Sequence, residues 1–477
     1  MQATDVTRGS KRGRDEAFEA FVDAHPEYER TRILDDLRAR EFARLDEAGQ
    51  VYLDYTGSGL YAASQVRRHS DLLLKGVFGN PHSTNPASVA STRLVEGCRR
   101  RVLDYFRAPE GEYAVIFTAN ASQALKLVGE SYPFAPGDRF LLTFDNHNSV
   151  NGIREFDRAR GARTLYVPMA PSELRVDEAV LDRFLDEAPP GRHNLFAYPA
   201  QSNFSGVRHP LEWVAKAQAR GWQVLLDAAA YVPTNRLDLS EVRPDFVALS
   251  FYKMFGYPTG VGVLIARREA LEGLHRPWFA GGTINVASVQ ADRFVPAPGG
   301  AAFEDGTPDF TSIPAVELGL DLLESVGVET IHARTQLLTG WLIGELLALT
   351  HPNGVPLARI YGPLGTEGRG ATITFNLQDA SGQVIDHRDV EERAAARNIS
   401  LRTGCFCNPG AGEVAMGITR DEIERCFVDG RGGMTYDDLR RCVDPHAAGA
   451  VRVSLGLATN FSDVWTFREY ARELLQG

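Results

Sequence analysis

One lysine stands apart from the other four lysines of the chain because of its position. Lys253 follows the apolar run DFVALS (245–250) and precedes the Gly/Pro-rich run MFGYPTGVGVL (254–264). α/β sheets place ligands at the carboxyl ends of their parallel strands. A lysine amine at such a point could attack a carbonyl carbon and hold a ligand covalently, or it could be a structural cation.

A carboxylate occupies the same kind of position after another apolar run. Asp227 ends the strand pattern WQVLLD (222–227). A carboxylate at the exit of a buried strand is costly unless it meets a cation or a hydrogen-bond donor. It could cap a helix, or it could keep the nitrogen of a pyridine ring protonated, which makes that ring an electron sink.

Two other turns place small and polar residues after apolar strands. Ala121 and Ser122 begin a helical pattern after VIFT (115–118), and backbone N–H groups at a helix start can bind a phosphate. His147 follows the run RFLLTF, where its ring could stack on a flat cofactor or cap a turn. Each signal alone is ambiguous, but together the lysine, the aspartate, the phosphate cradle and the histidine describe a pyridoxal phosphate site.

The elements that must position these residues follow from the alternation of patterns. From about residue 51 to 267, short apolar runs such as YAVIFT, NLFAYP and DFVALS alternate with helical patterns, which predicts a mostly parallel sheet in a large α/β domain. We expect residues 1–50 to form a tail (1–14) and a helical lead-in on the small domain. Residues 51–315 would form the cofactor-binding domain, and residues 316–477 a smaller C-terminal α+β domain that carries a cysteine loop.

The composition excludes several classes of protein. The 477 residues carry a net charge of −11 and no long basic block, so a nucleic-acid partner is not expected. No apolar run approaches the ~18 residues of a membrane span, and we expect a cytoplasmic protein without membrane contact. Five cysteines are an odd, low number for this length, so reduced thiols are expected.

Several longer stretches resemble the class V aminotransferase family, and within it the aminotransferase-like domain of molybdenum cofactor sulfurases, which is related to cysteine desulfurases. The resemblance covers most of the chain from about residue 50. It implies a pyridoxal phosphate enzyme of fold type I that works as a homodimer, with a seven-stranded, mostly parallel sheet. The matching stretches are YPAQSNFSGVRHPL (198–211), SFYKMFGYPTGVGVL (250–264), DNHNSV (145–150), LRTGCFCNPGA (401–411) and VRVSLG (451–456).

The resemblance also implies roles for individual residues. Lys253 would hold the cofactor, Asp227 would pair with its ring nitrogen, and His147 would stack on the ring. Arg452 would hold the substrate carboxylate through its bidentate fork. The remaining implied contacts are Ala121, Ser122, Ser250 and Tyr252 around the phosphate, Asn203 and Gln201 at the cofactor hydroxyl or the substrate, and Thr283 at the phosphate of the neighbouring subunit's cofactor.

Two positions depart from the family pattern. Ala230 stands where many desulfurases carry a side chain that bonds the cofactor oxygen. Gly412 replaces a further cysteine of the sulfurase motif. These departures bear on the tuning of the cofactor and on delivery of sulfur to a molybdenum cofactor in particular.

Cys405 and Cys407 lie one residue apart in the stretch ISLRTGCFCNPGAGE. A disulfide between them would close a very short, strained ring, and a metal site would need more ligands than the irregularly spaced Cys426, Cys442 and His446 supply. The surrounding glycines and proline suit a mobile loop better than a core strand. A mobile thiolate nucleophile fits best, and Cys407 matches the catalytic cysteine of desulfurases, with Cys405 as the other candidate.

Three functions remain open. The leading hypothesis is a desulfurase with Lys253, Cys407 and His147 as catalytic residues, which converts L-cysteine or a related amino acid into alanine and a persulfide for a protein or small-molecule acceptor. The second is an aminotransferase, epimerase or carbon–sulfur lyase in which the cysteines are incidental, because one fold hosts many reactions. The third is a non-enzymatic binding protein in which Cys405 and Cys407 hold a metal. The leading hypothesis, in contrast, expects no metal site.

Overall fold

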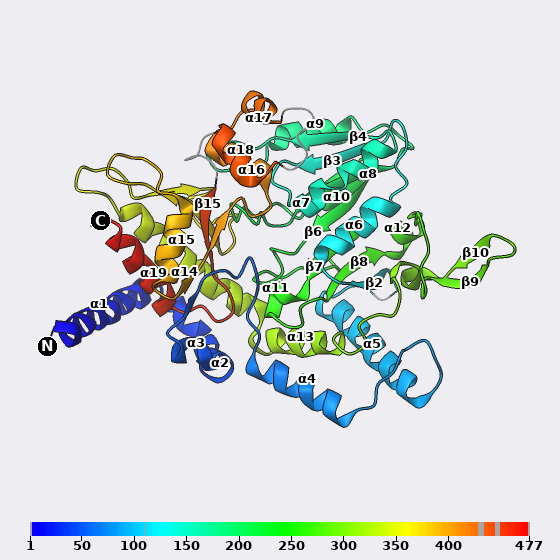
Figure 1. Cartoon of the computed structure of the whole chain (residues 1–477), viewed down its shortest axis with the longest axis horizontal. Helices are drawn as coiled ribbons and strands as arrows, with labels where there is room; N and C mark the ends of the chain where they lie inside the picture. Colours follow the sequence, from blue (N-terminus) through cyan, green and yellow to red (C-terminus); the bar gives the residue numbers. More distant parts are fainter. Residues whose placement is uncertain (1, 110, 428–433, 444–448, 476–477) are drawn as a thin grey trace.

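A seven-stranded sheet forms the centre of the larger part of the molecule (Figure 1). The computed structural model describes residues 2–109, 111–427, 434–443 and 449–475. The strand order is β2-β8-β7-β6-β5-β3-β4, and β8 is antiparallel to both neighbours, whereas the strands from β7 to β4 are parallel. The strands are β2 (Tyr113–Thr118), β3 (Arg139–Thr143), β4 (Arg163–Val167), β5 (Asn194–Pro199), β6 (Trp222–Asp227), β7 (Phe246–Ser250) and β8 (Gly262–Arg267). The predicted α/β fold with a mostly parallel seven-stranded sheet is confirmed.

Helices cover both faces of this sheet. Successive side chains of a strand point to opposite faces. Accordingly, Val115 and Phe117 belong to one apolar cluster, and Ala114 and Ile116 belong to the other. The first cluster packs against α5 (Pro86–Tyr105), α9 (Glu178–Asp186), α10 (Trp213–Gln218) and α13 (Pro314–Val326). The second cluster packs against α6 (Ala121–Ser131), α7 (Asn148–Asn151) and α12 (Arg268–Glu272). The other helices of this part are α4 (Ala63–Lys75), α8 (Arg154–Ala159) and α11 (Phe251–Phe255).

The parallel strands bring the chemically important residues to one edge of the sheet. β6 ends at Asp227, and β7 ends at Ser250 directly before α11, which carries Lys253. β3 ends shortly before His147. β2 runs in the same direction as β7 because β8 is antiparallel to both, so α6 also begins at this edge.

The C-terminal part contains a second, antiparallel sheet of four strands in the order β11-β12-β15-β14. The cysteine loop leaves β14, and Arg452 lies on β15, so two stretches of the predicted site come from neighbouring strands. The elements of this part are β11 (Ala358–Tyr361), β12 (Thr372–Leu377), β13 (Ile399–Ser400), β14 (Arg402–Gly404), β15 (Ala450–Ser454), α14 (Val328–Ala348), α15 (His387–Ala395), α16 (Pro409–Met416), α17 (Arg420–Cys426), α18 (Tyr436–Val443) and α19 (Phe461–Glu473).

The N-terminal segment packs on this second part. The short strand β1 (Val51–Tyr52) pairs with β13, and Asp54 forms a bridge to Ser454. Residues 1–14 were expected to be a mobile tail, but helix α1 (Gln2–Ala24) begins at Gln2. Phe18 and Phe21 of α1 pack on Phe461, and a helix extends easily from a turn that packing has already fixed.

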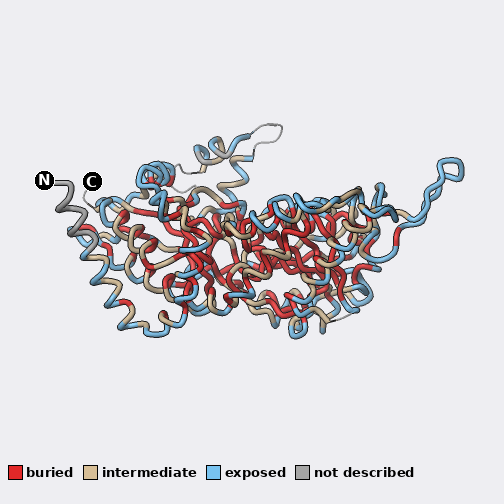
Figure 2. The backbone as a smooth tube through the Cα atoms, turned by 90° about the horizontal axis from the view of Figure 1, so that it is seen from below, coloured by how far each residue is buried: buried red, intermediate tan, exposed pale blue. Residues whose placement is uncertain are grey.

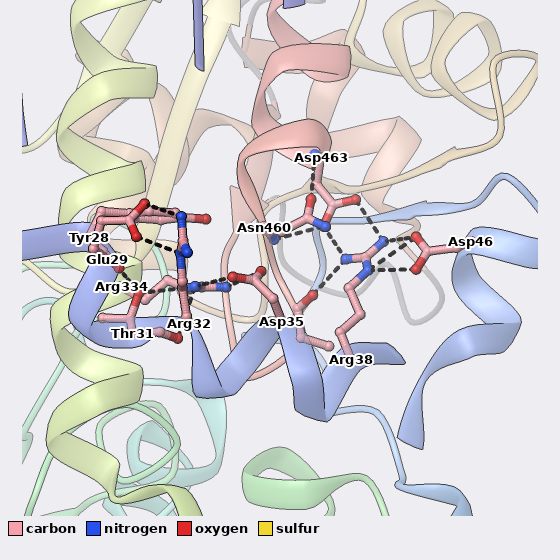
Figure 3. Close-up of polar contacts among 11 residues, drawn as sticks. Tyr28, Glu29, Thr31, Arg32, Asp35, Arg38, Asp46, Arg334, Asn460 and Asp463 are labelled. Atoms are coloured by element: carbon pink, nitrogen blue, oxygen red, sulfur yellow. Dashed lines mark hydrogen bonds and ion pairs between the residues drawn. The ribbon is translucent and has the colours of Figure 1, made fainter. Parts of the chain in front are cut away.

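Two buried arginines tie this segment to helices far away in the sequence (Figure 3). Arg334 of α14 pairs with Asp35 at 2.5 Å and lies over the ring of Tyr28. Arg38 of α2 (Ile33–Glu41) pairs with Asp463 of α19, also at 2.5 Å. Because breaking one partner would leave a buried charge uncompensated, these pairs fix the lead-in on the C-terminal helices. The domain boundaries themselves remain predictions. The other lead-in elements are η1 (Pro26–Thr31) and α3 (Ala43–Glu47).

Two features of the structure differ from what the sequence predicts. A hairpin of β9 (Ile284–Ser288) and β10 (Arg293–Pro296), followed by η2 (Gly299–Phe303), projects from the molecule (Figure 2). Cys426 and Cys442 form a disulfide with a Cα–Cα distance of 5.8 Å, so the expectation of reduced thiols is wrong for this pair. The two cysteines meet because α17 packs on α18. No cysteine motif in the sequence predicts this pairing. Among the helices described, none is long and apolar enough to cross a membrane.

Candidate active site

A cavity of about 400 Å³ opens at the carboxyl edge of the seven-stranded sheet. Its walls come from five separate stretches of the sequence, and each stretch follows a strand of that sheet. The lining residues that the sequence predicts for the site are Ala121, Ser122, His147, Gln201, Asn203, Asp227, Ala230, Ser250, Tyr252 and Lys253.

Some lining residues were missed. Ser149 follows His147 by two residues, and Thr259 and Gly260 follow Lys253 in the turn before β8. A polar or small residue in the turn after a strand is the signal that could have identified them. The other missed lining residues are Ala119, Asn120, Leu125, Pro199 and Ala229.

Lys253 is partly buried at the wall of the cavity, close enough to Asp227 for the two charges to interact. Burial lowers the pKa of Lys253, the carboxylate of Asp227 opposes this shift, and the charge of Arg452 reinforces it. Asp227 is 8% exposed, and one of its oxygens accepts the N–H of Ala229 at 3.0 Å. The lowered pKa increases the neutral fraction of the amine, which is the form that attacks an aldehyde.

The first turn of α6 is held against the end of β7. The Asn120 side chain caps the helix by accepting the N–H of Gln123 at 3.0 Å, and the N–H of Ala121 donates to Ser250 Oγ at 2.8 Å. A Cβ on Gly262 would lie 2.5 Å from the Cα of Asn120, so this glycine permits the close approach. The positive end of the helix dipole and the small residues Ala121 and Ser122 form an anion cradle.

His147 is oriented by Ser149. The Nδ1 of His147 accepts the N–H of Ser149 at 3.1 Å, so the neutral ring carries its proton on Nε2. Burial lowers the pKa of His147, and the nearby Asp227 carboxylate opposes that shift. The Oγ atoms of Ser149 and Ser122 lie 2.6 Å apart, which links the histidine turn to the anion cradle.

The cysteine loop is docked beside the cavity. The carbonyl of Cys407 accepts the N–H of Asn148 at 2.7 Å, and the carbonyl of Phe406 accepts from Asn203 Nδ2 at 2.7 Å. Asn408 donates to Asn203 Oδ1 at 2.9 Å. Phe406 and Cys407 both have φ of 54°, a left-handed conformation that costs about 1–2 kcal/mol per residue. The hydrogen bonds of the two carbonyls help to hold this conformation. Cys407 is exposed and Cys405 is partly exposed.

Arg452 lies behind this loop and does not line the cavity. It is 4% exposed and donates from Nη1 to the carbonyl of Asn203 at 3.0 Å and from Nη2 to Asp54 at 3.1 Å. The ring of Phe406 covers its guanidinium at 4.7 Å. Burial lowers the pKa of Arg452, and Asp54 opposes this shift. Asp54 is not among the predicted residues, because nothing in the sequence around it marks it as a partner of residues 402 and 452.

Thr283 lies at the base of the projecting hairpin and does not line the cavity of its own chain. It is 3% exposed, and its hydroxyl donates to the carbonyl of Ala280 at 2.8 Å. The role expected for it concerns a neighbouring subunit, and it stays a prediction. In the described part of the chain no group of three or more His, Cys, Asp or Glu side chains could hold a metal ion.

Comparison with known proteins places the chain in a family. A model of the class V aminotransferase family matches residues 51–467. Molybdenum cofactor sulfurase from Homo sapiens is 38% identical over 460 residues, which cover 92% of this chain and 51% of the human protein. The Arabidopsis thaliana molybdenum cofactor sulfurase is 37% identical over 495 residues, covering 95% of this chain and 60% of the plant protein. The chain thus spans about half the length of the curated relatives it matches.

Solved structures share the fold. A cysteine desulfurase from Thermococcus onnurineus NA1 superposes with a TM-score of 0.76 at 24% identity, covering 93% of this chain and 98% of that protein. The cystine C-S lyase C-DES superposes with a TM-score of 0.68 at 17% identity, covering 91% and 99%. The resemblance noted in the sequence is confirmed, and the chain belongs to the class V aminotransferase family.

Proposed function

We propose that the chain is a pyridoxal phosphate-dependent cysteine desulfurase, which removes sulfur from L-cysteine, releases alanine and carries the sulfur as a persulfide on Cys407. The observation that carries this proposal is the docking of the Cys407 loop, through the carbonyls of Phe406 and Cys407, beside the cavity that contains Lys253 and Asp227. Asn203 joins the two, because it lines the cavity and also donates to the carbonyl of Phe406.

The residues of the cavity fit pyridoxal phosphate. The Lys253 amine lines the cavity and has a lowered pKa, which suits covalent attachment to an aldehyde. One oxygen of Asp227 accepts a hydrogen bond from a backbone N–H, and the other can accept one from a protonated ring nitrogen. The start of α6, with Ser122 and Ser250, suits the phosphate, and about 400 Å³ lies within the ~300–1,000 Å³ of ligand pockets. When bound, the cofactor supplies an electron sink for the amino acid's α-carbon.

The protein side chains then have distinct tasks. Arg452 would hold the substrate carboxylate once the ring of Phe406 moves off its guanidinium, and Lys253 would move the α-proton. The thiolate of Cys407 attacks the sulfur of L-cysteine, so that a sulfur–sulfur bond forms while the carbon–sulfur bond breaks. The electron pair of the broken bond stays with the β-carbon, which takes up a proton and becomes the methyl group of alanine. His147 stacks on the ring, with its Nε2 proton available to the reacting groups.

The acceptor and the assembly are part of the same proposal. The names of the curated relatives make the molybdenum cofactor the first small-molecule sulfur acceptor to test. A homodimer is supported by the exposed apolar side chains of the projecting hairpin, where Val286 is 61% and Phe294 is 45% exposed. The cytoplasmic location expected from the sequence stays a prediction.

The test is to incubate the holoenzyme with L-cysteine, quantify alanine and keto acid, and locate added sulfur by mass spectrometry. We expect alanine in excess over keto acid and one added sulfur on Cys407. Cys407→Ala should abolish both products, whereas Cys405→Ala, the matched control two residues away, should retain them. Alanine at the normal rate from Cys407→Ala would overturn the proposal, and keto acid without persulfide would favour an aminotransferase or lyase.

A further inference from the structure

Arg452 does not stand alone in the carboxylate site. Arg402 of β14 lies directly opposite Arg452 of β15 in the antiparallel register. Like charges in directly opposed cross-strand positions destabilise a sheet. A structural reason is therefore needed for two arginines that face each other.

Asp54 supplies that reason by bridging the two guanidinium groups. Its Oδ2 accepts from Arg402 Nη2 at 2.6 Å and Nε at 3.0 Å, and its Oδ1 accepts from Arg452 Nη2 at 3.1 Å. The side chains of Asp54 and Arg452 are 8% and 4% exposed, whereas that of Arg402 is 53% exposed. A Cβ on Gly57 would lie 2.6 Å from both carboxylate oxygens, so the backbone closes tightly over the carboxylate.

The three side chains leave one positive charge in excess, together with unused donors. A guanidinium has five N–H groups, and Arg452 uses one on each Nη. Its Nε is buried and has no hydrogen-bond partner in the described structure. A buried donor without an acceptor is costly, so the site is incomplete until an anion arrives.

We propose that Asp54 is a positioning residue that holds Arg452 for the substrate carboxylate and cancels one of the two arginine charges, so that the site selects amino acids with a single carboxylate. This inference rests on the proposed function, because it takes Arg452 as the carboxylate-binding residue. Asp54 itself does not contact the substrate. It acts through the orientation of Arg452 and through the net charge of the site.

The charge count predicts an order among three variants. Arg402→Gln leaves Asp54 to neutralise Arg452 alone, so binding of a monocarboxylate should weaken, on the order of tenfold. Asp54→Asn leaves two uncompensated cations, so affinity should shift from L-alanine towards the dicarboxylate L-aspartate, again about tenfold in the ratio. The double variant carries one net positive charge, as the wild type does, and should return the ratio to near the wild-type value.

The measurement is the dissociation constant of each amino acid for the holoenzyme, obtained by titrating the absorbance of the bound cofactor, with thermal unfolding in parallel. Asp463→Asn is the matched control, because it also removes a buried partner of an arginine, Arg38, away from the cavity. It should lower the unfolding temperature and leave the L-aspartate to L-alanine ratio unchanged. If Asp54→Asn does not fold, the exposed Arg402→Gln still tests the charge count.

The outcomes distinguish a failure of the proposed function from a failure of the role of Asp54. Wild-type protein that takes up no cofactor or binds neither amino acid contradicts the proposed function. Three results would overturn the role of Asp54 and leave the proposed function standing: an unchanged ratio in Asp54→Asn, unchanged L-alanine affinity in Arg402→Gln, or a double variant worse than either single one. If the three side chains formed only a structural ion pair, the single variants would lower the unfolding temperature additively. The L-aspartate to L-alanine ratio would then stay unchanged.

Discussion

At the scale of single residues, the chemistry depends on how the environment of Lys253 changes its amine. A fully solvated lysine is almost entirely protonated at neutral pH and is a poor nucleophile. Burial and the charge of Arg452 shift Lys253 towards the neutral form, whereas Asp227 limits that shift. The carboxylate that we propose as the partner of the ring nitrogen therefore also keeps the amine from losing its proton too readily.

The first prediction concerns the pH at which Lys253 captures the aldehyde of pyridoxal phosphate. Because the pKa is lowered from 10.5, the neutral amine dominates at a lower pH than in a free lysine, and capture should rise with pH to a midpoint below 10.5. Asp227→Asn removes the opposing charge, so the midpoint should move further down. The adduct is trapped with borohydride at each pH and quantified by mass spectrometry.

The control is the exposed surface lysine Lys126, which pairs with Glu130 at 2.8 Å and should be labelled far less than Lys253 at neutral pH. Urea-unfolded protein should show a midpoint near that of free lysine. A folded-state midpoint equal to the unfolded one, or an upward shift in Asp227→Asn, would contradict the electrostatic account.

At the scale of elements, α16 determines where Cys407 lies. The helix packs so closely that a Cβ on Gly410 would lie 2.0 Å from the carbonyl oxygen of Phe144. Two residues further on, a Cβ on Gly412 would meet only Phe204, at 3.8 Å. The same helix therefore contains one glycine that docking requires and one that it does not.

The second prediction compares Gly410→Ala with Gly412→Ala. The added methyl at 410 forces the helix away from Phe144, which should cost about 1–3 kcal/mol of unfolding free energy and reduce persulfide formation about tenfold. At 412 an alanine fits and should change stability by less than about 1 kcal/mol, with the gain expected for a helix interior. Thermal unfolding and the persulfide yield distinguish them, while cofactor content stays the same in both. Equal behaviour of the two variants would mean that the docked position of α16 does not matter.

At the scale of the whole molecule, the hairpin of β9 and β10 projects from the rest of the chain and carries exposed apolar side chains (Figure 2). Phe279 and Phe294 stack on each other at 4.3 Å yet remain 44% and 45% exposed, and Val295 is 54% exposed. A two-stranded ribbon with apolar side chains in water is only marginally stable alone. Contact with a second copy would bury these residues and bring the base of the hairpin, with Thr283, towards another subunit.

The third prediction tests that assembly. The double variant Val286→Asp, Phe294→Asp places two charges in the proposed contact and should convert dimers into monomers in sedimentation velocity. Leu364→Asp, at a comparably exposed apolar residue of 54%, is the control and should leave the dimer intact. A monomeric wild type would remove the dimer from the proposed function, and a dimeric hairpin variant would place the interface elsewhere.

Much of the site could be read from the chain because each part of it follows a local pattern. An apolar run followed by a polar or small residue marks a strand exit, and parallel strands place all their exits at one edge. Asp227, His147, Lys253 and the start of α6 were predicted in this way, and the structure places them around one cavity. Periodicity also sufficed for the fold class, since alternating strands and helices admit few arrangements.

Contacts between distant parts of the chain carry no such local mark, and the three-dimensional packing alone settled them. Asp54 meets Arg402 and Arg452 about 350 and 400 residues later. Even Cys426 and Cys442, which are 16 residues apart, meet only because α17 packs on α18. The start of α1 and the docked position of α16 likewise depend on neighbours that are remote in sequence. Local residue patterns reflect backbone preference and burial, whereas the pairing of charges and thiols depends on which surfaces the completed fold brings within a few ångströms.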